Sequence, residues 1–192
     1  MSRALVAYAN LLTVCTGLLT APAVRAADAA DGDEPPAARE NSIRVGLVGA
    51  WQKMFDLDIW GAGALVTFGR EGDRAGGFGT LRFVEARTLG GLVVREGTLI
   101  GTAEWYWGGG WRAGLGGGCA YFALVRATTG EALQSFGPLL VGLVGYDFGL
   151  KPNFYVLGTL EAQIQGGGLW GSGQSYGGAF VLGPTLQTGV RF

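Results

Sequence analysis

The chain has 192 residues, with 14 Lys and Arg against 15 Asp and Glu, a formal net charge of −1 and no histidine. The missing histidine removes the commonest general base and the imidazole ligand of most metal sites, so we expect no enzymatic activity, no cofactor and no metal. Mean hydropathy is +0.29 and aromatic residues make up 11%. Such a chain is too apolar to remain disordered, despite its 37 glycines.

The first 26 residues have the pattern of a secretory signal peptide. Arg3 gives the positive start, residues 4–19 form the apolar stretch, and Val24-Arg25-Ala26 has the small residues of a cleavage site. We expect cleavage after Ala26. An uncleaved membrane anchor is the alternative, but polar residues and Pro22 interrupt a run that is barely long enough to span.

Residues 27–41 are acidic and rich in proline and alanine, which predicts a short flexible lead on the periplasmic side. Cleavage would remove two of the 14 basic residues and none of the 15 acidic ones, leaving a net charge of −3. This charge argues against a nucleic-acid partner. The remaining residues, 42–192, are short enough for a single domain.

Alternation of apolar and polar residues, which is typical of β-strands, runs through eight segments separated by Gly, Asp, Asn and Ser clusters. Each segment reaches the roughly 9–11 residues that a tilted strand needs to cross a membrane. Ten shorter strands are the alternative. The predicted strands are Ser42–Trp51, Asp58–Gly69, Gly77–Ala86, Gly97–Trp107, Trp111–Val125, Phe136–Phe148, Asn153–Gln165 and Gly178–Phe192.

The alternation is clearest between Asn153 and Gln165, where one side carries Phe, Val, Leu, Ala and Ile. In residues 139–144 both sides are apolar, and the pattern does not assign a side. After the signal, no run of 18 apolar residues remains for a spanning helix. The pattern therefore favours a barrel of strands, because lipid requires every backbone polar group to be paired internally.

The connections between the predicted strands alternate in length. Those at Arg70–Gly76, Gly108–Gly110 and Leu150–Pro152 are short, and those at Thr88–Glu96, Arg126–Ser135 and Gly166–Gly177 are longer. Short periplasmic turns and long outer loops are typical of membrane barrels. Aromatic residues near the strand ends predict two girdles, one at the short turns (Trp105, Trp107, Trp111, Phe148, Phe154, Phe192) and one at the long loops (Trp51, Trp60, Tyr121, Phe136).

Charged residues within the strands fall mostly on the polar side of the alternation, which predicts that they line the interior. An arginine facing lipid at mid-membrane would cost about 2–4 kcal/mol. Eight strands leave room for side chains and no wide channel, so the charges either pair in a plugged core or line a narrow pore. We expect Arg44 and Arg191, on the first and last strands, to share a carboxylate. The predicted network is Arg44, Arg82, Glu104, Arg112, Glu161 and Arg191.

The final strand alternates towards a terminal aromatic through Leu186, Val190 and Phe192. In this feature the chain resembles the bacterial outer-membrane β-barrel family, in particular the small eight-stranded OmpX and OmpA-transmembrane type. The resemblance implies an all-β, single antiparallel up-and-down transmembrane barrel in the outer membrane of a Gram-negative bacterium. It also implies that these three residues are an assembly signal read by the outer-membrane assembly machinery, and that outer-membrane lipid surrounds the barrel.

The function implied by this resemblance is a non-enzymatic envelope protein that is structural or presents its loops, with Trp170 and Tyr176 in the last loop as a contact surface for an unknown ligand. A narrow solute or ion pore is one alternative, and a soluble periplasmic lipid-binding barrel is another. Gly173–Gly177 matches the G-x-S-x-G elbow around Ser175. Because that motif needs a strand-to-helix turn and a histidine partner, we interpret the match as accidental.

Overall fold

A computed structural model describes residues 40–54, 57–88, 91–126, 132–151, 153–166 and 179–192. The predicted signal peptide with Ala26, residues 27–39 of the predicted lead, and the last loop with Trp170, Ser175 and Tyr176 lie outside the described residues. In the described ranges, no helix is long and apolar enough to cross a membrane.

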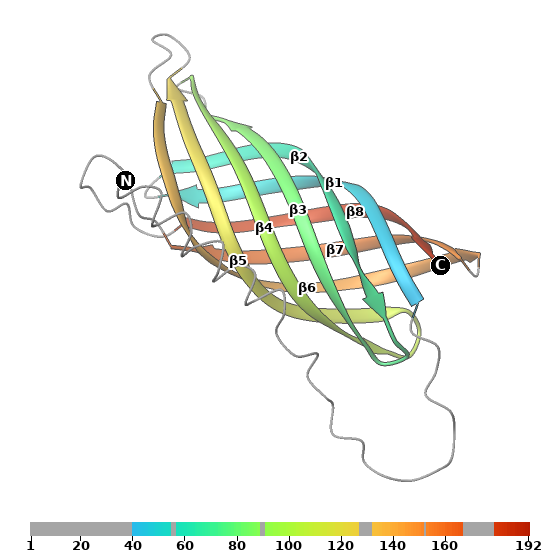
Figure 1. Cartoon of the computed structure of the whole chain (residues 1–192). Helices are drawn as coiled ribbons and strands as arrows, with labels where there is room; N and C mark the ends of the chain where they lie inside the picture. Colours follow the sequence, from blue (N-terminus) through green and yellow to red (C-terminus); the bar gives the residue numbers. More distant parts are fainter. Residues whose placement is uncertain (1–39, 55–56, 89–90, 127–131, 152, 167–178) are drawn as a thin grey trace, which may run out of the picture.

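Eight antiparallel strands, each paired with its neighbours in chain order, close into a barrel when β8 pairs with β1 (Figure 1). This confirms the predicted all-β, up-and-down architecture with eight strands and not ten. The strands are β1 (Glu40–Met54), β2 (Leu57–Glu71), β3 (Ala75–Arg87), β4 (Leu92–Trp107), β5 (Trp111–Arg126), β6 (Ala132–Lys151), β7 (Phe154–Gln165) and β8 (Ala179–Arg191).

The two ends of the barrel differ in their connections. The chain's last residue, Phe192, lies at one end together with the β2–β3, β4–β5 and β6–β7 turns, and we call this end the C-terminal rim. The other end, the loop rim, carries the remaining connections. Two of the three connections expected to be long are shorter than predicted, because β4 begins at Leu92 and β6 at Ala132. Similarly, β1 begins at Glu40, so residues 40 and 41 belong to the first strand and not to the flexible lead predicted for residues 27–41.

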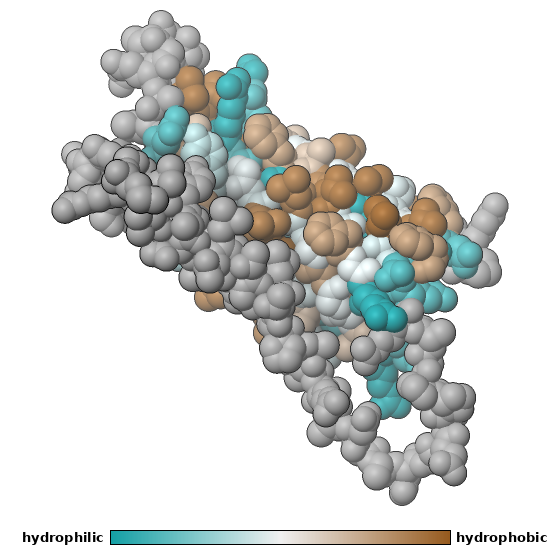
Figure 2. All heavy atoms as spheres, in the orientation of Figure 1, coloured by the Kyte–Doolittle hydropathy of each residue, from teal (hydrophilic) through white to brown (hydrophobic). Residues whose placement is uncertain are grey.

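The outer face of the barrel is apolar around its middle, as Figure 2 shows for the face in view. In the middle of β1 the exposed side chains are Ile43, Val45 and Leu47, and the alternate residues Arg44 and Val48 are buried. An apolar belt exposed on a closed sheet is the surface expected of a barrel in contact with lipid.

The interior is only partly polar, because apolar side chains lie inside the barrel as well as on its outer face. Towards the loop rim the lumen is filled by buried apolar side chains, among them Ile59, Val94 and Phe122. A second buried cluster contains Val48, Ala50, Leu65, Val84 and Val181.

The apolar lumen accounts for the ambiguous segment of β6. Leu139 and Val141 are buried inside, and Leu140 and Val144 are exposed outside. Both sides of this strand are therefore apolar because one faces the outer belt and the other the apolar half of the lumen. Composition alone cannot separate these two environments.

Candidate functional site

Six charged side chains near the C-terminal rim form a closed ring inside the barrel, which we call the charge ring. Arginines and acids alternate around it, so each charge lies between two of opposite sign. Three arginines and three carboxylates leave the ring neutral. In order around the ring, the members are Arg44 (β1), Glu71 (β2), Arg191 (β8), Asp147 (β6), Arg112 (β5) and Glu104 (β4).

The ion pairs of the charge ring have the geometry of charge-assisted hydrogen bonds. Arg44 reaches Glu71 at 3.0 Å and Glu104 at 2.9 Å. Arg112 bridges Glu104 at 3.0 Å and Asp147 at 2.8 Å. Arg191 closes the ring, with Nη2 2.6 Å from Asp147 and Nε 2.9 Å from Glu71.

The remaining two strands, β3 and β7, contribute aromatic residues to the ring. The hydroxyl of Tyr155 accepts a hydrogen bond from Arg44 Nε at 2.7 Å and donates one to Glu71 at 2.9 Å. The Phe78 ring lies 3.8 Å from the Arg44 guanidinium carbon, and the Tyr155 ring lies 4.0 Å from that of Arg191. Flat guanidinium groups favour such stacking. All eight strands therefore meet at this level.

Deeper in the lumen lies a second polar group, the inner glutamate cluster. Arg82 lies 3.3 Å from Glu161 and 3.9 Å from Glu96. The amide of Gln165 donates to Glu96 at 2.9 Å, and the amide of Gln52 donates to the other oxygen of the same carboxylate. These side chains are almost fully buried. They come from four strands and contact one another and the neighbouring Gln163. Among the described residues, some of their buried polar atoms, such as Arg82 Nε and Gln52 Oε1, have no hydrogen-bond partner.

Of the six residues predicted to line the interior, four lie in the charge ring and two in the inner glutamate cluster. Arg44 and Arg191 share a carboxylate, that of Glu71. Sequence reasoning missed Glu71, Glu96 and Asp147. Glu71 and Glu96 had been assigned to connections. The side of Asp147 was hidden by the ambiguous pattern of residues 139–144 on the same strand. Its position next to Phe148, which is predicted as an outward girdle residue, is the signal that could have found it.

A small cavity of about 20 Å³ separates the two polar groups. Its walls include Arg44 and Glu104 of the charge ring, Glu161 of the inner glutamate cluster, and the residues Thr80 and Thr102. This volume and these polar walls suit a single water molecule.

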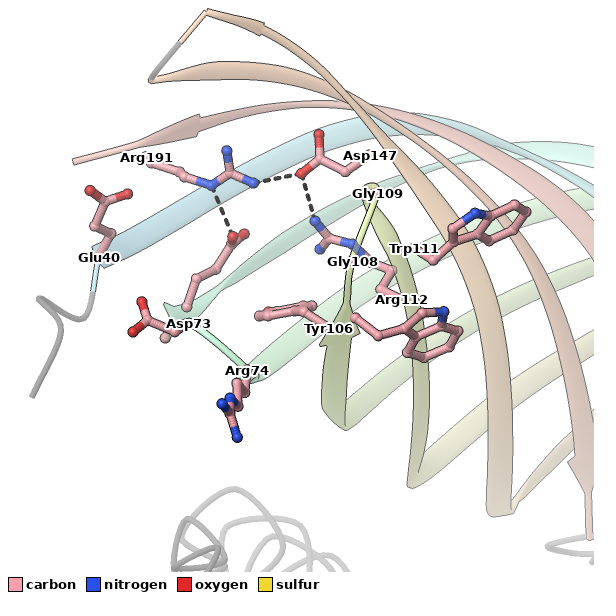
Figure 3. Close-up of a pocket in the computed structure, with 14 residues that line it drawn as sticks. Glu40, Asp73, Arg74, Tyr106, Gly108, Gly109, Trp111, Arg112, Asp147 and Arg191 are labelled. Carbon is pink, nitrogen blue, oxygen red and sulfur yellow. Dashed lines mark hydrogen bonds and ion pairs between the residues drawn. The ribbon is translucent and has the colours of Figure 1, made fainter. Parts of the chain in front are cut away.

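A larger hollow of about 760 Å³ opens at the C-terminal rim, and we call it the vestibule. Figure 3 shows Arg112, Asp147 and Arg191 of the charge ring at its wall, together with Glu40, Asp73 and Arg74 nearer the rim. The hairpin Gly108–Gly110 lies beside it, and Gly109 and Gly110 have positive φ values of 80° and 87°. Glycine adopts this backbone region at no steric cost, which permits the tight turn.

The vestibule ends at packed side chains. Tyr155 and Leu157 have no exposed surface, and Arg44 is 1% exposed. Nearer the loop rim, Ile59 and Val94 also have no exposed surface. These side chains are therefore packed against their neighbours, and the lumen is filled at two levels along its length. In the described residues no group of three or more His, Cys, Asp or Glu side chains could hold a metal ion.

The residues predicted as girdles lie on the outward side of their strands. Near the C-terminal rim, large exposed fractions are found at all six: Trp105, Trp107, Trp111, Phe148, Phe154 and Phe192. Near the loop rim, Trp60 is 70% exposed and Tyr121 40%, whereas Trp51 and Phe136 are half-buried. Trp51 is covered by the rings of Trp60 and Phe180, with centroids 6.4 and 6.2 Å away.

Comparison with known proteins finds likeness in structure and none in sequence families. No protein-family model matches the chain, and no curated protein matches it. Neisserial surface protein A superposes with a TM-score of 0.66 at 10% identity, covering 81% of this chain and 99% of that one. Ail, the attachment invasion locus protein of Yersinia pestis, gives a TM-score of 0.58 at 14% identity, covering 80% and 98%. A structure of Ail holding the heparin analogue sucrose octasulfate gives 0.56 at 15% identity, covering 80% and 99%. At these identities the likeness concerns the fold.

Proposed function

We propose that this chain, which has the fold of the small eight-stranded outer-membrane β-barrels, is a non-enzymatic envelope protein in the outer membrane of a Gram-negative bacterium. It spans the membrane as a plugged barrel, and its role is structural or rests on the surface that its loops present. The C-terminal rim faces the periplasm and the loop rim faces outwards.

The observation that carries this proposal is the filled lumen. The charge ring, together with Phe78 of β3 and Tyr155 of β7, closes one level of the lumen with paired, neutral charge, and apolar side chains fill the other end. A transported solute would have to displace buried ion pairs, each costly to break. The outward apolar belt also supports membrane insertion over a soluble lipid-binding barrel, which would carry its apolar side chains inside.

Conductance of the refolded protein in planar lipid bilayers tests the plugged state. We expect no ohmic current steps from the wild type. A narrow pore would instead give steps whose size changes in Glu104→Gln and Glu161→Gln, because both carboxylates would lie on the ion path. Steps of this kind would overturn the plugged barrel in favour of transport.

Membrane insertion is tested separately by fractionation and by gel mobility. We expect the protein in the outer-membrane fraction, and a faster-running band when the detergent sample is not boiled. Recovery in the soluble periplasm would contradict the proposal and favour the soluble barrel.

A further inference from the structure

Charged side chains gather on the outer face of the barrel at one place near the loop rim, across β1 to β4. Strand register places five charged residues and one tryptophan next to one another: Lys53 opposite Asp58, Arg87 opposite Trp60, and Glu85 opposite Arg95. Three cations and two anions give this group a net charge of +1. We call these six residues the rim patch.

Two arginines of the rim patch are held side by side by one carboxylate. Arg87 Nη2 lies 3.0 Å from Glu85 Oε1, and Arg95 Nε lies 3.2 Å from Glu85 Oε2. Their side chains are nevertheless 75% and 56% exposed. Glu85 therefore positions both guanidinium groups while much of their donor surface still faces outwards.

The rim patch lies directly beyond the apolar belt. On β3 the outward residues before Glu85 are Leu81 and Phe83, which are 60% and 57% exposed. Trp60, 70% exposed, adjoins Arg87. Tryptophan prefers the boundary between hydrocarbon and headgroups. The arginines therefore lie at the height of lipid headgroups, directly on the loop-rim side of the lipid-facing side chains.

We infer that the rim patch binds the phosphate of a phosphorylated lipid headgroup in the surrounding membrane, with Arg87 and Arg95 as the phosphate ligands and Trp60 packing against the lipid. Paired guanidinium groups match the geometry and charge of a phosphate, which a single ammonium matches less well. Strand register places Phe180 of β8 beside Lys53 and Ile164 of β7 beside Phe180. Both are exposed apolar residues, so the charged group ends at β1 and the bound lipid lies over β1–β4. The inference rests on the proposed membrane position.

Native mass spectrometry of the detergent-solubilised protein tests the inference. The probe is lipid A, a diphosphorylated glucosamine lipid, and its dephosphorylated form is the comparison. We expect the wild type to retain one lipid A with at least about tenfold higher affinity than the dephosphorylated lipid, and inorganic phosphate not to displace it. The variant R87Q/R95Q should lose this preference.

The matched control is Arg70→Gln, because Arg70 is also an exposed, outward-facing arginine but lies at the opposite rim. It should bind lipid A as the wild type does. Equal retention of both lipids by the wild type, or unchanged preference in R87Q/R95Q, would overturn the inference. Displacement by inorganic phosphate alone would also overturn it, in favour of a simple anion site.

The fast-running band of the unboiled sample shows whether a variant has folded. Each variant must show this band, so that loss of lipid binding is distinguished from loss of the barrel. If R87Q/R95Q does not fold, the single variants and R87K/R95K replace it. The lysine pair keeps the charge but loses the planar fork, so we expect intermediate affinity. Affinity equal to that of the wild type would contradict the role given to the guanidinium geometry.

Discussion

At the scale of single residues, Arg44 shows how a full positive charge is kept in the lumen at 1% exposure. Its three nitrogens donate to Glu104, Glu71 and Tyr155, and its flat face stacks on Phe78. Burying a charge is costly unless it is paired and hydrogen-bonded. Each donor of this guanidinium has a partner, so the cost is offset locally.

Glu104 is the acid whose removal should cost most, because its carboxylate contacts both Arg44 and Arg112. Glu104→Gln would place an amide between two buried cations. We expect it to lower the free energy of unfolding by about 3–5 kcal/mol, measured by urea unfolding of the protein in lipid vesicles followed by tryptophan fluorescence. Asp73→Asn, at an exposed position in the β2–β3 turn, is the control and should unfold as the wild type does. A loss from Glu104→Gln no greater than from this control would show that the ring does not contribute to stability.

At the scale of strands, the sequence predicts the number of strands, their direction and most of the inward charges. Alternation succeeds where the two sides of a strand meet different surroundings, as at Glu104 or Arg112. It fails in β6, where lipid and an apolar lumen look alike. It also fails at residues 92–96, because Arg95, Glu96 and Gly97 together resemble a loop. In the structure Arg95 points outwards as part of the rim patch, and Glu96 points inwards as part of the inner glutamate cluster. Because both faces carry a charge here, the alternation did not reveal the start of β4.

Strand packing also separates glycines that the sequence cannot distinguish. A Cβ at Gly118 would overlap the backbone carbonyl of Leu99 on the neighbouring strand, whereas one at Gly97 would meet nothing within 4 Å. Gly118 therefore permits the close approach of β4 and β5, and Gly97 is open to substitution.

Gly118→Ala should consequently cost about 1–3 kcal/mol or more through strain, whereas Gly97→Ala should be neutral or stabilise by up to about 1 kcal/mol. The two variants differ only in position, so each is the other's control. The fraction of unboiled, fast-running band after refolding at increasing urea concentration measures the difference. Similar curves for both would mean that the strands can adjust around Gly118.

At the scale of the whole molecule, the first and last strands, β1 and β8, meet where the barrel closes. Backbone hydrogen bonds of 2.9 Å join Asn41 and Phe192 in both directions, and Phe192 is 67% exposed on the outside. The folded barrel holds the backbone of the last residue while leaving its ring on the surface. Because an exposed ring contributes little to packing within the barrel, we expect Phe192 to matter for assembly and not for the stability of the folded barrel.

Phe192→Ala should therefore reduce the amount of barrel assembled in cells several-fold but leave the urea midpoint of the refolded protein close to that of the wild type. Outer-membrane yield measures the first effect, and unfolding in vesicles the second. Leu160→Ala, on the outward face of β7, is the control, because it removes a similarly exposed apolar group away from the C-terminus. Equal yields from the two variants would argue against an assembly signal at Phe192.

The charge ring has a consequence for the time course of folding. Arg191 joins Glu71 on β2 to Asp147 on β6, and it lies on β8, the strand that closes the barrel against β1. The loop of pairs is thus incomplete until β8 has docked. Contacts made after the folding barrier slow escape from the native state without hastening entry into it. We therefore expect the charge ring to lower the unfolding rate, and so to lengthen the lifetime, of the completed barrel.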